Sequence, residues 1–258
     1  MKTDDELILV ERPTPGIVRL VLNRPERRNA LSMALMAQLK EVLAMIMAEE
    51  CVRVVLLRGA GPVFCSGLDL QEAAADDSHR SAAIVAETLR IFAGLPAVTV
   101  AVVHGAAVGG GAGLMAACDF VVAERDAKIG FPEVRLGLVA ALIMAFLRRQ
   151  LRERHLRELL LGGELISAER ALEMGLVNRV VPNGTGEQAA AKFVRAVFQG
   201  APGAIARTKA LVARTGDSID REIETALQFH LEARTSDEAK EGIGAFLKKC
   251  VPSWERGQ

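Results

Sequence analysis

The alternation of apolar and polar residues along the chain predicts strands and helices in turn. Short apolar runs rich in Val, Leu and Ile, each ended by a charged or turn residue, predict strands. They lie at 16–23, 52–59, 97–105, 119–125, 127–131 and 176–181. Apolar residues at helical spacing lie between them, at 31–50, 78–94, directly after the glycines of 105–113, and at 136–161, with Ser32 as a predicted N-cap. This order predicts an α/β fold with largely parallel pairing.

The pattern changes after residue 181, where strand-like runs stop. Amphipathic helices are predicted at 187–199, 202–214, 218–232 and 236–249. The sequence "TSDE", from Thr235 to Glu238, has the form of a helix capping box. We therefore predict an α/β core over residues 1–195 and a helical C-terminal region over residues 196–258.

Composition and charge narrow the classes of partner. The 258 residues include 32 Lys plus Arg and 32 Asp plus Glu, so the net charge gives no reason to expect nucleic acid or a membrane surface as a partner. The four cysteines have no metal-site spacing and are expected to be small buried residues in a reducing compartment. The cysteine spacing gives no reason to expect a bound metal. The first 15 residues are charged and do not read as a signal peptide, so we expect a cytoplasmic protein.

Two glycine-containing loops follow two of the predicted strands. They are "GAGPVFCSGLDL" at 59–70 and "GAAVGGGAGL" at 105–114. In layered α/β folds such loops gather at one end of the sheet, where ligands bind. Glycines at the start of a helix leave the backbone N–H groups open to an anion. A dinucleotide site would need the pattern GxGxxG, whereas this chain has GxGxG. A P-loop would need a Gly-Lys-Ser/Thr ending, which is absent here. Tight packing of a helix on a strand, without a ligand, is a further alternative.

Several motifs together resemble the enoyl-CoA hydratase/isomerase family, also called the crotonase family. They are "LNRPERRNALS" (22–32), "FCSGLDL" (64–70), "GAAVGGGAGLMAACDF" (105–120), "IGFPEVRLGL" (129–138), "LLLGGELISAERALEMGLVNRVVP" (159–182) and "EGIGAFLKK" (241–249). The resemblance implies a crotonase-like spiral of β-β-α turns followed by a helical oligomerisation region. It also implies an acyl-CoA thioester as substrate, with coenzyme A entering as part of that substrate and no separate cofactor, and assembly as a homotrimer or homohexamer.

By resemblance, two backbone amides bind the thioester oxygen, one from each glycine loop. At the matching positions these belong to Leu68 and Gly110. Removing a proton from the carbon next to a thioester carbonyl, or adding a nucleophile one carbon further away, builds negative charge on that oxygen. Two fixed donors stabilise the charge by about 3–4 kcal/mol each. The glycines of the second loop would then clear the approach to the Gly110 amide.

The acid–base group implied by the resemblance is Glu133, in the "GFPEV" turn. Its apolar neighbours are expected to raise its pKa toward neutrality, and a solvent-facing turn residue is the alternative interpretation. Family hydratases usually carry a second glutamate at the position of Gly113. One carboxylate suffices to move a proton between carbons, so this departure leaves hydration and isomerisation both open. Lesser candidates for direct chemistry are Asp69, Glu72, Glu87 and His104. Asp69 is expected to brace its loop, and His104 is expected to form a hydrogen bond with the backbone.

Further residues are implied to bind the CoA or acyl part of the substrate. They are Arg27, Arg28, Ser66, Gly67, Asp69, Leu70, Gly109, Phe246 and Lys249, the last two from the tail that in this family reaches a neighbouring subunit. The arginines, with Arg24, read equally well as a solvated basic loop. We expect an enoyl-CoA hydratase of fatty-acid or branched-chain acyl-CoA degradation. The alternatives are a 3-enoyl to 2-enoyl-CoA isomerase, a thioester hydrolase or lyase, and a non-catalytic acyl-CoA-binding homologue.

Overall fold

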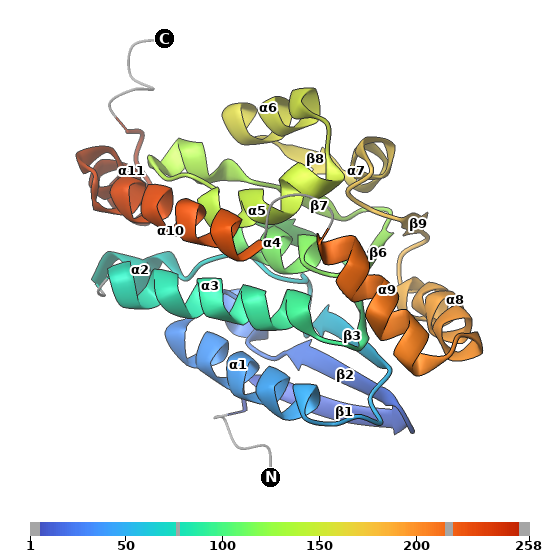
Figure 1. Cartoon of the computed structure of the whole chain (residues 1–258). Coiled ribbons are helices and arrows are strands. Elements are labelled where there is room, and N and C mark those ends of the chain that lie inside the picture. Colours follow the sequence, from blue (N-terminus) through green and yellow to red (C-terminus); the bar gives the residue numbers. More distant parts are fainter. Residues whose placement is uncertain (1–5, 76–77, 215–218, 253–258) are drawn as a thin grey trace.

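The computed structural model describes residues 6–75, 78–214 and 219–252 as strands packed between helices (Figure 1). The strands are Ile8–Thr14 (β1), Ile17–Leu22 (β2), Val54–Gly59 (β3), Val98–Val103 (β4), Ala106–Val108 (β5), Phe120–Glu124 (β6), Lys128–Gly130 (β7), Leu165–Ser167 (β8) and Arg179–Val181 (β9). The helices of the first half are Met33–Met47 (α1), Leu70–Ala75 (α2), Ser78–Gly94 (α3) and Gly110–Ala116 (α4), with a 3-10 turn at Pro25–Arg27 (η1). Those of the second half are Ala141–Gln150 (α5), Glu153–Gly162 (α6), Ala168–Met174 (α7), Gly186–Gln199 (α8), Pro202–Arg214 (α9), Ile219–Thr235 (α10) and Asp237–Leu247 (α11), with a 3-10 turn at Pro132–Leu136 (η2).

A six-stranded sheet forms the centre of the molecule, in the order β1-β2-β3-β4-β6-β9. The strands from β2 to β9 pair in parallel, while β1 is an antiparallel edge strand. Every residue of β4 is buried, as expected for a central parallel strand that is covered on both faces. The Val-rich composition of β3 and β4 follows from that double burial.

A second, smaller sheet in the order β5-β7-β8 gives the fold its spiral form. The chain runs through β4 in the large sheet, β5 in the small sheet and then α4. It repeats this path through β6, β7 and then α5. Each turn is therefore a β-β-α unit, and the fold class predicted from the sequence is confirmed.

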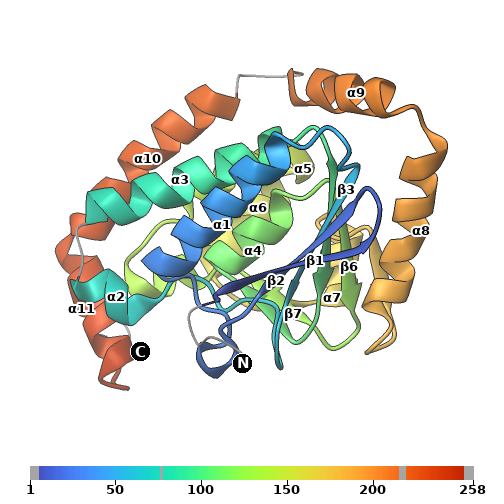
Figure 2. The same ribbon diagram turned by 90° about the horizontal axis from the view of Figure 1, so that it is seen from below.

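Helices cover the two faces of the large sheet differently. The larger core lies between the sheet and α1, α3, α4 and α5. On the other face α8 packs against β4 and β6, where the Phe193 and Phe120 rings stack with centroids 4.4 Å apart. Figure 2 shows α8 and α9 on one side and α10 and α11 returning over the other. Because α10 packs on α3 and α5, the C-terminal helices contribute to the interior of the core. The predicted boundary at residue 195 falls inside α8.

Several elements differ from the sequence prediction. The helix predicted at 136–161 is broken, because Gly137 adopts a left-handed conformation (φ +68°) and Leu151 is extended, so that η2, α5 and α6 replace it. The predicted capping box is wrong by one residue, since Ser236 is the N-cap of α11 and accepts from the Ala239 amide at 3.1 Å. Ser32 caps α1 as predicted, accepting from the Leu35 amide at 3.1 Å.

Short or exposed elements account for the other differences. The edge strand β1 was not predicted because most of its side chains are exposed and show no buried alternation. β5, β8, α7 and α2 are too short to show a period. Of the four cysteines, Cys65 and Cys118 are buried as expected, whereas Cys51 and Cys250 are exposed. No helix in the described ranges has the length and apolar character needed to cross a membrane.

Candidate active site

The loop between β3 and α2 holds one of the two predicted donor amides, that of Leu68. The Leu31 amide donates to the carbonyl of Gly67 (2.8 Å), and the Asp69 amide donates to the carbonyl of Leu31 (3.1 Å). Residues 67–69 thus pair with Leu31 in the manner of a short parallel bridge. Since successive N–H groups of an extended chain point to opposite sides, the Leu68 N–H points away from Leu31.

The loop between β5 and α4 holds the other donor amide, that of Gly110. Val108 donates to the carbonyl of Cys65 (3.0 Å) and Gly109 donates to the carbonyl of Gly130 (2.9 Å), which fixes the loop on both sides. Gly109 is the N-cap of α4 with φ +53° and ψ −124°, a conformation that favours glycine. Gly110 is the first residue of α4, so its N–H has no acceptor inside the helix.

These two amides face a shared space. Within the described part of the chain, neither the Leu68 nor the Gly110 amide donates to a protein acceptor. A Cβ atom built on Gly67 would lie 3.4 Å from the Gly110 nitrogen, and one built on Gly110 would lie 3.8 Å from the Leu68 nitrogen. The two loops therefore lie close together, and the N–H groups of Leu68 and Gly110, which no described acceptor engages, lie where the loops meet.

Glu133 places a carboxylate beside these donors. It belongs to η2, and its Oε1 lies 3.1 Å from the position that a Cβ atom on Gly109 would take. The side chain is only half-buried as a whole, but its Oε2 is buried and has no hydrogen-bond partner among the described residues. Burial raises the pKa of Glu133 from 4.5 to about 7, against the effect of a hydrogen bond from its own backbone. A carboxyl with such a pKa can accept and return a proton near neutral pH.

Gly113 stands where the family resemblance implies a second glutamate, and it lies next to Ile143. A Cβ atom on Gly113 would lie 2.8 Å from Cγ1 of Ile143, which is closer than real side-chain contacts. Gly113 lies in the buried face of α4, and Ile143 comes from α5 and is 5% exposed. An apolar side chain thus fills the space next to Gly113, and no larger residue fits at that position unless Ile143 moves.

The lesser candidates are engaged elsewhere. Asp69 pairs with Arg24 at 2.6 Å and accepts from the Gln71 amide at 3.1 Å, so that it braces its loop as expected. Burial would raise the pKa of Asp69, but the hydrogen bond from Arg24 leads the interactions that lower it overall. Glu72 accepts from the Met33 amide at the start of α1.

The two remaining candidates also have structural partners. Glu87 forms a surface pair with Lys40 at 2.8 Å. His104 contacts the carbonyl of Gly61 at 3.0 Å, as predicted for a histidine at the end of a strand. Of the four carboxylates considered, Asp69, Glu72, Glu87 and Glu133, the described contacts leave Glu133 as the one that faces the donor amides.

A cavity of about 120 Å³ brings together most of the predicted site residues. Its lining includes Ser66, Gly67, Leu68, Leu70, Gly109, Gly110 and Glu133. The rest is largely apolar and comes from α3, from α5 and from the segment that precedes α5.

The other predicted substrate contacts lie outside this cavity. Arg27 and Arg28 are exposed in and after η1, and the Arg28 carbonyl accepts from the Ser66 amide at 3.0 Å. Phe246 and Lys249 are exposed on α11 and directly after it. Arg24, in contrast, is held by Asp69 and by the Ala30 carbonyl.

Sequence reasoning missed Asn29, His230 and Arg234. Asn29 is fully buried with φ +55°, and its Nδ2 faces the carbonyls of Ala60, Val63 and Phe64, so it ties η1 to the first glycine loop. An asparagine in a turn is a signal that could have indicated this left-handed position. His230 and Arg234 line the cavity from α10, and nothing local in the sequence places that helix there. The described side chains include no group of three or more His, Cys, Asp or Glu that is arranged to hold a metal ion.

Comparison with known proteins shows the family of the chain. The family model described as enoyl-CoA hydratase/isomerase matches residues 13–257. A Thermus thermophilus relative is 36% identical over 95% of this chain and 99% of its own. The mevalonyl-coenzyme A hydratase sidH of Aspergillus fumigatus is 32% identical, over 95% of this chain and 94% of its own.

A solved structure gives the same result. The crystal structure of an enoyl-CoA hydratase from Mycobacterium avium superposes with a TM-score of 0.85 at 32% identity, and the match covers 96% of this chain and 98% of that one. The family model spans nearly the whole chain, and both sequence and structure match over almost their full lengths. The chain therefore belongs to the enoyl-CoA hydratase/isomerase family and is an enzyme of that type.

Proposed function

We propose that the enzyme hydrates 2-enoyl-CoA thioesters, with Glu133 as its acid–base group. One observation supports this above all others: the Leu68 and Gly110 amides share a cavity with the buried Oε2 of Glu133, and none of the three has a hydrogen-bond partner among the described residues. The two donors suit an oxygen on which charge develops. The carboxylate beside them suits a proton that moves to or from the neighbouring carbon.

The proposed reaction begins with the thioester oxygen bound to both amides. Water attacks the β-carbon and gives one proton to the Glu133 carboxylate, while the electron pair of the double bond shifts to make an enolate. The amides stabilise its oxygen, with each donor contributing about 3–4 kcal/mol in a dry site. Glu133 then delivers its proton to the α-carbon, a role that contributes about 10² to 10⁴-fold to the rate.

Isomerisation of 3-enoyl-CoA to 2-enoyl-CoA is a second candidate. Position 113 is a glycine, and the space next to it is filled by the apolar side chain of Ile143. Glu133 is therefore the one carboxylate among the described residues that line the cavity. A single carboxylate can take a proton from one carbon and return it to another. The protein named enoyl-CoA isomerase/hydratase fer4 from Mycosarcoma maydis, 32% identical over 92% of this chain, belongs among the relatives.

The proposal extends to the substrate and its setting. The apolar cavity lining suits a hydrocarbon acyl group, and the exposed Arg27 and Arg28 beside Ser66 suit the phosphates of CoA. No cofactor is needed beyond the CoA of the substrate. We place the reaction in fatty-acid or branched-chain acyl-CoA degradation, in the cytoplasm.

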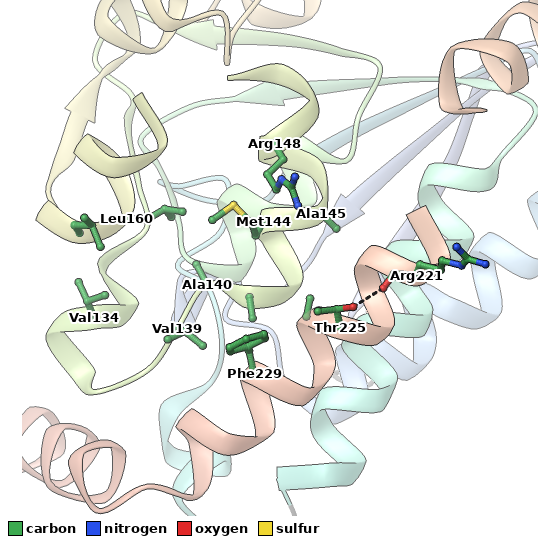
Figure 3. Close-up of a pocket in the computed structure, with 13 residues that line it drawn as sticks. Val134, Val139, Ala140, Met144, Ala145, Arg148, Leu160, Arg221, Thr225 and Phe229 are labelled. Atoms are coloured by element: carbon green, nitrogen blue, oxygen red, sulfur yellow. Dashed lines mark hydrogen bonds between the residues drawn. The ribbon is translucent and has the colours of Figure 1, made fainter. Parts of the chain in front are cut away.

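Assembly into a homotrimer or homohexamer is also part of the proposal. A groove of about 630 Å³ lies between α5, α6 and α10, with apolar side chains along it (Figure 3). Leu161 and Phe229 in this groove are 69% and 59% exposed. Exposed apolar surface of this kind suits burial by a second copy of the chain. Light scattering of the wild type and of Leu161→Glu tests it: we expect a trimer or hexamer that dissociates in the variant, and a monomeric wild type would refute it.

The proposed activity is tested with two substrates and one product assay. Crotonyl-CoA should lose its enoyl absorbance, whereas a 3-enoyl-CoA that gains conjugated absorbance would favour isomerisation. Release of free CoA thiol would indicate hydrolysis. CoA esters that bind without any of these changes would indicate a non-catalytic homologue and refute the proposal.

A further inference from the structure

A histidine from the C-terminal helical region lines the catalytic cavity. His230 of α10 borders the same cavity as Glu133 and the two donor amides. Its neighbour Phe229 lies in the outer groove, next to Val139 and Ala140 (Figure 3). Val139 and Ala140 line both the groove and the cavity, so this short segment separates the two. α10 thus presents an apolar ring to one side of the segment and an imidazole to the other.

The surroundings of His230 favour its neutral imidazole, which bonds the backbone of Val139. Burial, and after it the charge of Arg234 one turn further along α10, lowers the pKa of His230 from 6.5 to about 4. A hydrogen bond with the backbone of Val139 opposes this shift, as expected when the ring N–H donates to a carbonyl. A neutral imidazole has one N–H and one lone-pair nitrogen. With the N–H directed to Val139, the other nitrogen remains as an acceptor.

Hydration in this cavity needs such an acceptor. Water that attacks the β-carbon gives one hydrogen to Glu133, and its second hydrogen must be held if the oxygen is to stay aligned. Ile143, which lies next to Gly113, lines the cavity with apolar atoms. Of the described side chains that line the cavity, those with an acceptor atom are Ser66, Glu133 and His230. Ser66 belongs to the loop that carries the Leu68 donor, whereas His230 approaches from a separate element.

We propose that His230 positions the attacking water by accepting a hydrogen bond from its second hydrogen. The inference rests on the proposed hydratase function and adds a residue to it. The water O–H bond facing Glu133 breaks and that proton goes to the carboxylate. The oxygen bonds to the β-carbon, the π electrons move to the thioester oxygen, and the proton on Glu133 passes to the α-carbon. His230 keeps its own proton throughout.

Two variants separate positioning of water from support of the fold. His230→Leu removes the acceptor, and His230→Gln restores one through its amide oxygen. Each variant is assayed for hydration of crotonyl-CoA and for α-proton exchange of butyryl-CoA in D₂O. The exchange needs Glu133 and the donor amides but no attacking water. Gln228→Leu, an exposed position on the same helix, is the matched control.

We expect His230→Leu to lower the kcat of hydration by about 10 to 100-fold, as for a misplaced reactant, while α-exchange stays within about twofold. His230→Gln should recover most of the loss, and the control should match the wild type. Wild-type hydration in His230→Leu, or equal loss of hydration and exchange in a folded variant, would overturn the inference. A wild type that exchanges α-protons without hydrating would refute the role of His230 and leave the amides and Glu133 intact. A wild type that does neither would refute the proposed function itself.

Discussion

The candidate catalytic cavity has two walls that are built in different ways. The amide wall consists of the loops at 65–69 and 108–110 and presents the N–H groups of Leu68 and Gly110. The side-chain wall consists of Glu133, Ile143 and His230, which come from η2, α5 and α10. Backbone hydrogen bonds of 2.8–3.1 Å, between the two loops and from them to Leu31 and Gly130, hold the amide wall. The side-chain wall depends instead on how three separate elements pack together.

In the proposed mechanism, this difference separates the groups that bind the thioester oxygen from the groups that determine which reaction follows. An N–H donor is independent of the side chain on its residue, so the amide wall can serve any thioester that forms an enolate. The outcome of the reaction then depends on which groups face the α- and β-carbons. Those groups belong to the side-chain wall, where Ile143 provides apolar atoms and Glu133 and His230 provide the polar ones.

Replacing Glu133 should lower the rate of catalysis more than any other change considered. It alters the side-chain wall and leaves the amide wall as it is. Glu133→Gln should lower kcat by about 10² to 10⁴-fold, because it removes the acid–base group and keeps the side-chain shape. Binding of CoA esters should persist, since the amide wall is unchanged. Steady-state kinetics and calorimetric titration measure the two effects. Glu87→Gln, in the surface pair with Lys40, is the control and should keep full activity.

Replacing Gly110 breaks the amide wall alone. Gly110→Pro removes one donor, and Gly110→Ala adds a similar Cβ, 3.1 Å from Cδ1 of Leu31, but keeps the donor. Proline is tolerated at the first position of a helix, so the comparison isolates the N–H group. We expect kcat of the proline variant to be about 10² to 10³-fold below that of the alanine variant. Equal rates for the two variants would remove Gly110 from the mechanism.

The pH dependence of stability sharpens the account of Glu133. Its folded pKa of about 7 lies above the ordinary value of 4.5, so its contribution is full below pH 4.5 and is lost as pH rises through about 7. The free energy of unfolding of Glu133→Gln, relative to wild type, should therefore increase between pH 4.5 and 8, by at most about 3 kcal/mol. Denaturant unfolding at both pH values measures this. A difference that stays constant with pH would contradict the raised pKa.

The smallest expected effect concerns the contact between Gly113 and Ile143. Gly113→Glu should destabilise the fold by about 1–3 kcal/mol through overpacking, because its Cβ would lie 2.8 Å from Ile143 Cγ1. Combining it with Ile143→Ala should restore part of that loss. Thermal unfolding of both single variants and of the double variant gives the coupling between the two positions. Additive effects would show that Ile143 does not control this space.

The amide wall could be predicted from the sequence because it is local. The glycines at 109–111 and the run at 66–69 follow two recognisable strands. The family resemblance then predicts the Leu68 and Gly110 amides as the donors, and the structure brings both to one cavity. Glu133 was also accessible, through the motif that surrounds it. Its apolar neighbours also predicted the direction of its pKa shift. That Oε2 lies buried without a partner among the described residues could not be predicted, because this depends on Gly109 and on elements distant in sequence.

The rest of the side-chain wall could not be predicted. A single helix was expected across 136–161, and the break at Gly137 is what turns Val139 and Ala140 into the divider between the cavity and the outer groove. Nothing in the local sequence marks His230, because the residues around it have the ordinary pattern of an amphipathic helix. Only the packing of α10 across α3 and α5 brings that imidazole to the cavity.

The most direct test of the central claim is the crystal structure of Glu133→Gln with crotonyl-CoA bound. The account predicts that the thioester oxygen lies about 2.7–3.1 Å from the amide nitrogens of both Leu68 and Gly110. It also predicts the residue 133 side chain beside the α-carbon. A thioester oxygen bound elsewhere, or donor amides that have turned to protein acceptors, would contradict it.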